Sequence, residues 1–266
     1  MIDASAVELH YLWLPLLGFI VGLLATMVGG NGAFFFPPAL ILLFQVEPRV
    51  AIATSLAAVI PIGLIGSWEH YKRQNINLPI GLSFGVAGLT GALVGAWISN
   101  RVDPTTLLTT FGTYCVILGL FTMRMPRKKP REAAYTPPEH FADIRKDQMP
   151  SIIIFGIISG VVAGLFGTSG TAPVLAALLI LKFPIRLVIG TSVMIVFINA
   201  LSGFGGHLIL GEIDPSLIAW LGSGAALGAF IGPRLLVNIR PERKEGPLRY
   251  VFSAIIIAMG LMLIFR

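Results

Sequence analysis

The sequence predicts an all-α polytopic membrane protein made of two inverted-topology repeats of five apolar helices each. Of its 266 residues, 55% are hydrophobic and only 12% are charged, about half the charged fraction of a soluble domain. Glycines and a few polar residues recur in the two halves at a nearly constant separation. Basic residues gather in loops between apolar stretches, as they do in membrane proteins. These observations exclude a soluble globule, a disordered chain and a fibrous protein.

The repeat is clearest in two glycine-rich segments. Residues 17–25 precede the turn Gly29-Gly30-Asn31-Gly32, and residues 155–163 precede the turn Gly167-Thr168-Ser169-Gly170. A run of matched pairs at one shift predicts a duplicated fold. A shift of 138 positions pairs Gly18, Gly22, Ala25, Gly29 and Gly32 with Gly156, Gly160, Ala163, Gly167 and Gly170. A shift of 137 pairs Thr54-Ser55, Gly66, His70, Gly91 and Gly95 with Thr191-Ser192, Gly203, His207, Gly228 and Gly232.

Each half contains five apolar stretches that predict helices. They are residues 11–28, 33–46, 51–68, 78–99 and 107–123, then 151–166, 172–183, 188–206, 216–232 and 250–265. Crossing a bilayer takes about 20 helical residues, so the second stretch of each half is too short and the first is marginal. The first two stretches of each half therefore either span separately or form a re-entrant hairpin. The predicted organisation is an N-terminal repeat over 1–123, a linker over 124–150 and a C-terminal repeat over 151–266.

The distribution of charge predicts the orientation. If the sides alternate and the N-terminus lies outside, 16 of 19 basic residues fall inside, and Arg49, Arg101 and Arg266 fall outside. Cytoplasmic loops carry such an excess, so both termini are predicted outside and the linker is predicted to be a cytoplasmic connection. No basic residue precedes the first apolar run, which argues against a cleaved secretory signal. An odd number of crossings per half inverts the second half relative to the first, as in many secondary transporters.

The two glycine-rich breaks are the predicted substrate site. Interrupted helices expose backbone N–H groups and the positive end of a helix dipole near the bilayer midplane, an arrangement that suits an oxyanion. The alternative is that the glycines only permit tight helix packing. The candidate substrate-binding residues at the breaks are Gly29, Gly30, Asn31, Gly32, Gly167, Thr168, Ser169, Gly170 and Thr171.

Further polar residues are weaker candidates. The hydroxyls of Thr54-Ser55 and Thr191-Ser192 either cap the third helix of each half or face the same cavity. Asn199 lies inside an apolar stretch, where an amide is costly unless it is paired, and it joins the substrate-binding candidates. His70 and His207 are predicted on opposite sides of the membrane, either as gating or proton-linked groups or simply in the headgroup region. Glycine stripes over 81–95 and 224–232 are predicted helix-packing faces.

Several classes of function are excluded by what the apolar stretches contain. None has a clear acidic or basic residue at its centre, whereas proton pumps and cation carriers commonly use buried carboxylates. Four scattered histidines and the lone Cys115 provide neither a metal cluster nor a hydrolytic acid–base set. The sequence therefore predicts no enzyme, no metal, no cofactor and, despite a net charge of +6, no nucleic-acid partner. An anion held by backbone dipoles fits better than a cation.

These motifs resemble a known family. The glycine run into the first turn, the prolines after it and the segment Pro48-Arg49-Val50-Ala51-Ile52-Ala53-Thr54-Ser55 are similar to the TauE/SafE family. The second copy repeats the pattern over 160–173 and 184–192, although its turn reads Gly-Thr-Ser-Gly where the family is often richer in glycine. The resemblance covers nearly the whole chain. It implies a multi-pass inner-membrane transporter of sulfite, organosulfonates or related small anions.

The resulting hypothesis is alternating access by two inverted halves whose hairpin tips face one another. The tips would bind a small sulfur-containing anion through backbone N–H groups, Asn31, Ser169 and threonine hydroxyls. A passive anion channel and a carrier of another small organic acid remain alternatives. Coupling stays open as well, since either protons travel with the anion or the membrane potential alone drives transport.

Overall fold

The structure is a computed structural model that describes residues 9–28, 31–124, 138, 140–211, 213–236 and 245–266. Within these residues all regular secondary structure is helical, and each of the ten predicted apolar stretches forms an α-helix. The first half contains α1 (Leu14–Val28), α2 (Phe36–Leu43), α3 (Pro48–Lys72), α4 (Leu78–Arg101) and α5 (Pro104–Arg124). The second half contains α6 (Met149–Phe166), α7 (Thr171–Ile180), α8 (Ile185–Leu210), α9 (Pro215–Leu236) and α10 (Glu245–Ile264). Short 3-10 helices are η1 (Leu9–Trp13), η2 (Asn31–Phe35) and η3 (Phe141–Asp143).

Six of the described helices are long and apolar enough to cross a membrane, namely α3, α4, α5, α6, α8 and residues 215–232 of α9. The second helix of each half is short, as predicted, with 8 residues in α2 and 10 in α7. At 1.5 Å per residue, neither reaches across about 30 Å of hydrocarbon. The first helices differ from one another, because α6 has 18 residues and α1 has 15. The protein is therefore a multi-pass helical bundle with two short helices inside it.

Both short helices follow a turn. In the first half, η2 folds back on the end of α1, so that a Cβ on Gly32 would lie 2.6 Å from the Ala25 nitrogen. In the second half, α7 packs on α6 after the turn at residues 167–170. We call α1, η2 and α2 the first hairpin, and α6 and α7 the second hairpin.

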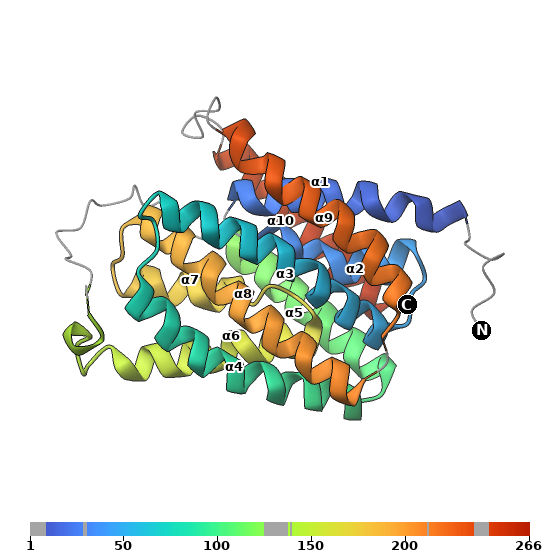
Figure 1. The fold of residues 1–266 in the computed structure, drawn as a ribbon. Coiled ribbons are helices and arrows are strands. Elements are labelled where there is room, and N and C mark those ends of the chain that lie inside the picture. Colours follow the sequence, from blue (N-terminus) through green and yellow to red (C-terminus); the bar gives the residue numbers. More distant parts are fainter. Residues whose placement is uncertain (1–8, 29–30, 125–137, 139, 212, 237–244) are drawn as a thin grey trace.

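Helices of the two halves pack on one another across the molecule. The pairs are α1 with α9, α4 with α6, α3 with α8 and α5 with α10 (Figure 1). Glycines allow the backbones to approach closely. A Cβ on Gly22 of α1 would lie 2.4 Å from the Ala225 carbonyl oxygen, and a Cβ on Gly160 of α6 would lie 2.0 Å from the Gly88 carbonyl oxygen. The glycine stripes thus pack helices together, as predicted.

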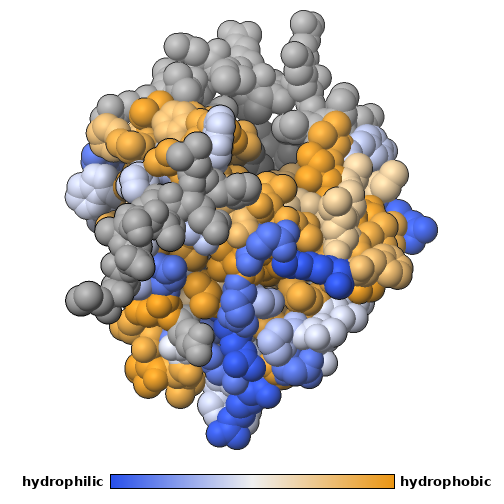
Figure 2. Space-filling view, turned by 90° about the vertical axis from the view of Figure 1, so that its right-hand side faces the viewer, coloured by the Kyte–Doolittle hydropathy of each residue, from blue (hydrophilic) through white to orange (hydrophobic). Residues whose placement is uncertain are grey.

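Interhelical hydrogen bonds define the two ends of the bundle. At one end, Arg49 donates to the Val102 carbonyl at 2.9 Å, and Arg266 donates to Gln45 next to the end of α2. At the other end, the Asn77 backbone N–H donates to Thr191 Oγ1 at 3.0 Å and its side chain donates to the Pro138 carbonyl. Figure 1 accordingly has the start of α1 and the end of α10 toward the same side. Figure 2 views that end, where hydrophilic residues gather between hydrophobic flanks.

Caps fix where several helices begin. Glu47 accepts the N–H groups of Arg49 and Val50 at the start of α3, and Asn77 accepts that of Ile80 at the start of α4. Asp103 accepts the Thr106 N–H at 2.8 Å before α5. That bond lowers the pKa of this exposed carboxyl, since it stabilises the charged form.

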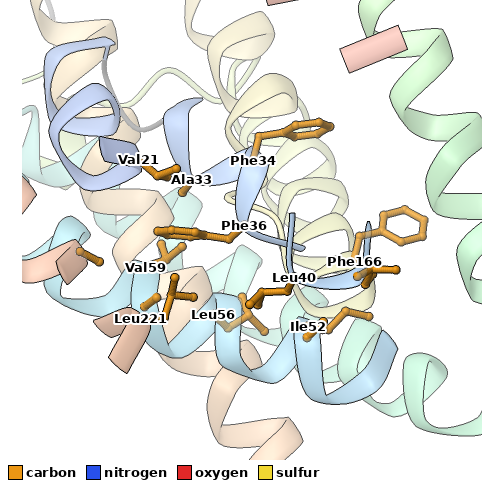
Figure 3. Packing of buried hydrophobic residues seen from close by; sticks show 14 of the residues in the cluster. Val21, Ala33, Phe34, Phe36, Leu40, Ile52, Leu56, Val59, Phe166 and Leu221 are labelled. Carbon is orange, nitrogen blue, oxygen red and sulfur yellow. The ribbon is translucent and has the colours of Figure 1, made fainter. Parts of the chain in front are cut away.

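One apolar core is shared by both halves. It joins the first hairpin to α3, α9 and the end of α6. Figure 3 shows Phe36 beside Val59 and Leu40 near Leu56, so α2 lies against α3. A second cluster around Phe84 and Ile152 joins α4, α6, α7 and α8. These clusters fix both hairpins against the spanning helices.

Candidate functional site

The second hairpin turns through two left-handed glycines. Gly167 has φ 68° and ends α6, while Gly170 has φ 57° and precedes α7. Residues that carry a side chain rarely adopt this backbone conformation, whereas glycine adopts it without strain. A Cβ on Gly170 would also lie 2.3 Å from the Ser159 carbonyl oxygen. The sequence Gly-Thr-Ser-Gly therefore makes a tight reversal that brings two hydroxyl residues to the start of α7.

A cavity of about 230 Å³ lies beside this turn. We call it the α7 cavity. Turn residues form part of its wall, aromatic and aliphatic residues from η2, α5 and α10 form the opposite wall, and α7 runs along it. Its lining residues are Phe34, Tyr114, Leu118, Phe121, Thr122, Thr168, Ser169, Gly170, Thr171, Ala172, Leu175, Ala176, Leu179, Phe252 and Ile256.

Three of the five polar side chains that line the α7 cavity belong to the turn and the start of α7, and the other two belong to α5. Thr168 is 1% exposed, and its Oγ1 has no hydrogen-bond partner. Thr171 Oγ1 donates to Ser169 Oγ at 2.5 Å. The N–H groups of Thr171 and Ala172 begin α7, where an α-helix has no internal acceptor for them. None of the described residues that line this cavity is charged, and the dipole at the start of α7 favours a bound negative charge.

Aromatic rings close the cavity on one side and bring the two hairpins together. Phe166, the last residue of α6, stacks on Phe111 with centroids 5.1 Å apart and on Tyr114 at 5.5 Å. Phe34 of η2 lies 6.3 Å from Tyr114. Figure 3 shows Phe34 pointing away from α3, toward the side on which Phe166 lies. The first hairpin therefore reaches this cavity through a phenyl ring.

The structure describes only part of the predicted first break. Gly29 and Gly30 lie outside the described residues, Asn31 begins η2, and Gly32 is packed against Ala25. Of the described residues in this segment, Phe34 is the one that lines the α7 cavity.

The four hydroxyl residues predicted in the third helices lie one to two turns inside α3 and α8. Their interpretation as caps of these helices is wrong, because α3 begins at Pro48 and α8 at Ile185. Ser55 and Ser192 donate to carbonyls of their own helices, and Thr191 accepts from the Asn77 N–H. Thr54 is fully buried with no partner for its Oγ1. None of the four lines the α7 cavity.

Asn199 and the two histidines also lie away from the cavity lining. Asn199 is fully buried, and its Nδ2 donates to Ser159 Oγ at 2.8 Å. His207 is 1% exposed, with Nε2 2.8 Å from the Gly164 carbonyl oxygen. His70 lies at the opposite end of the bundle, half-buried in the last turn of α3, and its Nδ1 has no partner.

Sequence reasoning missed the aromatic walls and Ser159. Tyr114 and Phe252 carry no local signal, because an aromatic residue in an apolar helix is ordinary. Ser159 did carry a local signal, because it is a polar residue between glycines in an apolar helix. Asn199 carried another, because a buried amide requires a hydrogen-bond partner. Only the fold identifies that pair, because 40 residues separate its members.

Comparison with known proteins identifies the family. Residues 14–263 match the family described as "Sulfite exporter TauE/SafE". Relatives include "Probable membrane transporter protein YunE" of Bacillus subtilis, 26% identical over 97% of this chain and 98% of that protein. Another is "Probable membrane transporter protein YdhB" of the same organism, 27% identical over 93% and 97%. A third is "Probable membrane transporter protein MJ0441" of Methanocaldococcus jannaschii, 25% identical over 95% and 96%.

No solved structure matches the chain. The family match spans nearly the whole sequence, and the relatives have about the same length. The family is one of transporters and not of enzymes. The chain belongs to the TauE/SafE sulfite exporter family of membrane transporters.

Proposed function

We propose that the protein is a secondary transporter of a small sulfur-containing anion, such as sulfite or an organosulfonate, and that the anion binds at the second break. The observation that carries this proposal is the α7 cavity, whose lining includes Thr168, with its buried unpartnered hydroxyl, and the first residues of α7. The family description supplies the substrate class.

The binding chemistry follows from these groups. Sulfite and sulfonate carry their negative charge on several oxygens, each of which accepts hydrogen bonds. Thr168 Oγ1, Ser169 Oγ and the N–H groups of Thr171 and Ala172 are donors on one side of the cavity. A helix N-terminus favours an anion by its dipole, and the described lining contains no lysine or arginine, which allows the anion to leave again.

Alternating access by two inverted repeats is the proposed mechanism. Its support is that the four main pairs of packed helices map onto one another when the halves are exchanged. The pair α1 with α9 becomes α6 with α4, while α3 with α8 and α5 with α10 each become themselves. Contacts correspond as well. A Cβ on Gly228 would meet the Phe19 carbonyl oxygen at 2.1 Å, and one on Gly91 would meet that of Ile157 at 2.2 Å.

The cavity supports access from one end. Its far part is lined by Phe121, which is 58% exposed, and Leu179, which is 45% exposed. Phe34 and Tyr114 also line it, and the ring of Phe166 stacks on Tyr114 behind them. Separation of these rings would open the second route, so the aromatic contact between the hairpins is the proposed gate.

Flux into proteoliposomes tests the function. Radiolabelled sulfite and a panel of sulfonates and carboxylates are offered under an imposed pH gradient or an imposed membrane potential. We expect saturable uptake and exchange with unlabelled anion on the other side. Flux that neither saturates nor exchanges identifies a channel, and uptake of carboxylates alone identifies an organic-acid carrier. No flux above empty vesicles for any anion contradicts the proposal. Comparison of the two gradients separates proton coupling from drive by the potential.

Thr168→Val tests the site. It removes the unpartnered hydroxyl with little change in volume, and we expect kcat/KM to fall about tenfold, the contribution of one hydrogen bond to a charged group. Thr113→Val is the matched control, because Thr113 is exposed on α5 and its hydroxyl already bonds the Thr109 carbonyl. Equal flux in both variants would exclude Thr168 from the site.

A further inference from the structure

We propose that α8 holds the second break in place through a polar stripe, with Asn199 and His207 as positioning residues on either side of the turn. Gly203 lies between them, and the three residues recur every four positions, so they share one helix face. A Cβ on Gly203 would lie 3.4 Å from the Gly164 Cα, which places this face against the end of α6. In this proposal Asn199 and His207 position the turn and do not bind the substrate themselves.

His207 binds the broken end of α6. The Gly164 carbonyl belongs to the last turn of that helix, where no N–H of the helix continues to serve it. A carbonyl only accepts, so His207 Nε2 carries the proton in the 2.8 Å contact. In the neutral ring, Nδ1 is then an acceptor for Asn100 Nδ2, which lies 3.3 Å away and also donates to the Ala96 carbonyl at 2.8 Å. The network is therefore complete with a neutral imidazole.

Asn199 acts on the other side of the turn through Ser159. Its Nδ2 donates to Ser159 Oγ at 2.8 Å, and Ser159 Oγ donates to the Gly170 carbonyl at 2.7 Å. Gly170 is the residue directly before α7. The two bonds thus set the position of the first N–H groups of α7, which lie in the α7 cavity. All of these groups are fully or almost fully buried, so water does not compete for the bonds.

The first hairpin has no equivalent in the same positions. At the shifts of 138 and 137, Ser159 corresponds to Val21 and Asn199 to Ile62, and both of these are buried apolar side chains. His207 corresponds to His70, whose Nδ1 lacks a partner. The polar stripe is consequently a property of the second half, which also carries the hydroxyl turn of the proposed site.

Hydrogen–deuterium exchange on the protein in nanodiscs tests the stripe without any substrate. We expect Ser159→Ala and His207→Leu to speed exchange of α7 amides about tenfold, the effect of losing one buried hydrogen bond, with α2 amides unchanged. His207→Gln keeps a donor toward Gly164 and should exchange like the wild type. Ser202→Ala is the matched control on α8, since that hydroxyl bonds only its own helix at Ile198. Unchanged α7 exchange in Ser159→Ala overturns the proposal, even if His207→Leu does not fold.

The transport readout rests on the proposed function and is separate from the exchange result. For labelled sulfite, Ser159→Ala should raise KM several-fold with a nearly unchanged kcat, because the donors are displaced but not removed. Adding Thr168→Val to Ser159→Ala should cost less than the product of the two single effects, since both act on one site. Altered exchange with no sulfite flux in the wild type would sink the function and leave the positioning role standing. Unchanged α7 exchange in the variants, together with sulfite flux in the wild type, would support the function and overturn the positioning role.

Discussion

Both hairpins pack in apolar clusters, and the second is held by buried hydrogen bonds as well. The first hairpin packs through apolar side chains such as Val21, Phe36 and Leu40 against α3. The second is joined to α8 by hydrogen bonds at Gly164 and through Ser159 at Gly170. Its turn also supplies Thr168 and Ser169 to the α7 cavity, to which the first hairpin supplies Phe34. The main helix pairs are thus alike in the two halves, while the polar contacts at the hairpin turn belong to the second half.

Valine at the close helix crossings gives the largest expected effect and tests how equivalent the halves are. Gly160→Val and Gly22→Val each force a side chain against the backbone of a neighbouring helix, at Gly88 and Ala225. We expect each to lower the free energy of unfolding by about 3 kcal/mol, at the upper end for overpacking, as measured by denaturant unfolding in micelles. Gly222→Val is the control, because a Cβ there meets nothing within 4 Å. If only one of Gly160→Val and Gly22→Val lowered the free energy of unfolding, the two helix crossings would not be equivalent.

Substitution of the two corresponding histidines, His207 and His70, should change the free energy of unfolding by different amounts. His207→Leu leaves the buried Gly164 carbonyl without its donor, and we expect a loss of about 2 kcal/mol in the free energy of unfolding. His70→Leu removes a half-buried ring whose Nδ1 has no partner, so we expect a change within about 0.5 kcal/mol. Equal losses in the two variants, measured in the same unfolding assay, would contradict the difference between the hairpins.

The helix caps of α4 and α9 give the smallest expected difference. Asn77 and Asp214 are related by the shift of 137, and each accepts N–H groups at the start of its helix. Asn77 is buried and also donates to Pro138, whereas Asp214 is half-buried and makes backbone bonds only at the start of α9 in the described structure. Asn77→Ala should therefore cost about 1 kcal/mol more than Asp214→Ala. A larger loss for Asp214→Ala in thermal unfolding would reverse this ranking.

Much of the fold could be predicted because membrane helices are read from local sequence. All ten helices lie at the apolar stretches, and the short second helices follow from the spacing of the glycine turns. The sequence predicts the second turn as a site from Thr168, Ser169 and its glycines, and of these Thr168, Ser169 and Gly170 line a cavity while Gly167 does not. The main helix pairs correspond when the two halves are interchanged, which agrees with the predicted repeat. The repeat itself stays a prediction.

What could not be predicted depends on long-range contacts. The cavity wall contains Tyr114 and Phe252, which lie in α5 and α10 and look like any other apolar helix residue. Asn199 was expected near the substrate because a buried amide needs a partner. Its partner proved to be Ser159, which no local rule connects to it. The hydroxyls of Thr54 and Thr191 were placed at a helix start because hydropathy located α3 and α8 a few residues too late.

A structure with a heavy-atom substrate analogue tests the central claim most directly. We would diffuse 2-bromoethanesulfonate into crystals of the protein and locate its bromine by anomalous scattering. We predict one peak in the α7 cavity, with the sulfonate at Thr168–Thr171 and the bromine along α7. A peak elsewhere, or a sulfonate held away from this turn, would contradict the assignment of the second break as the anion site.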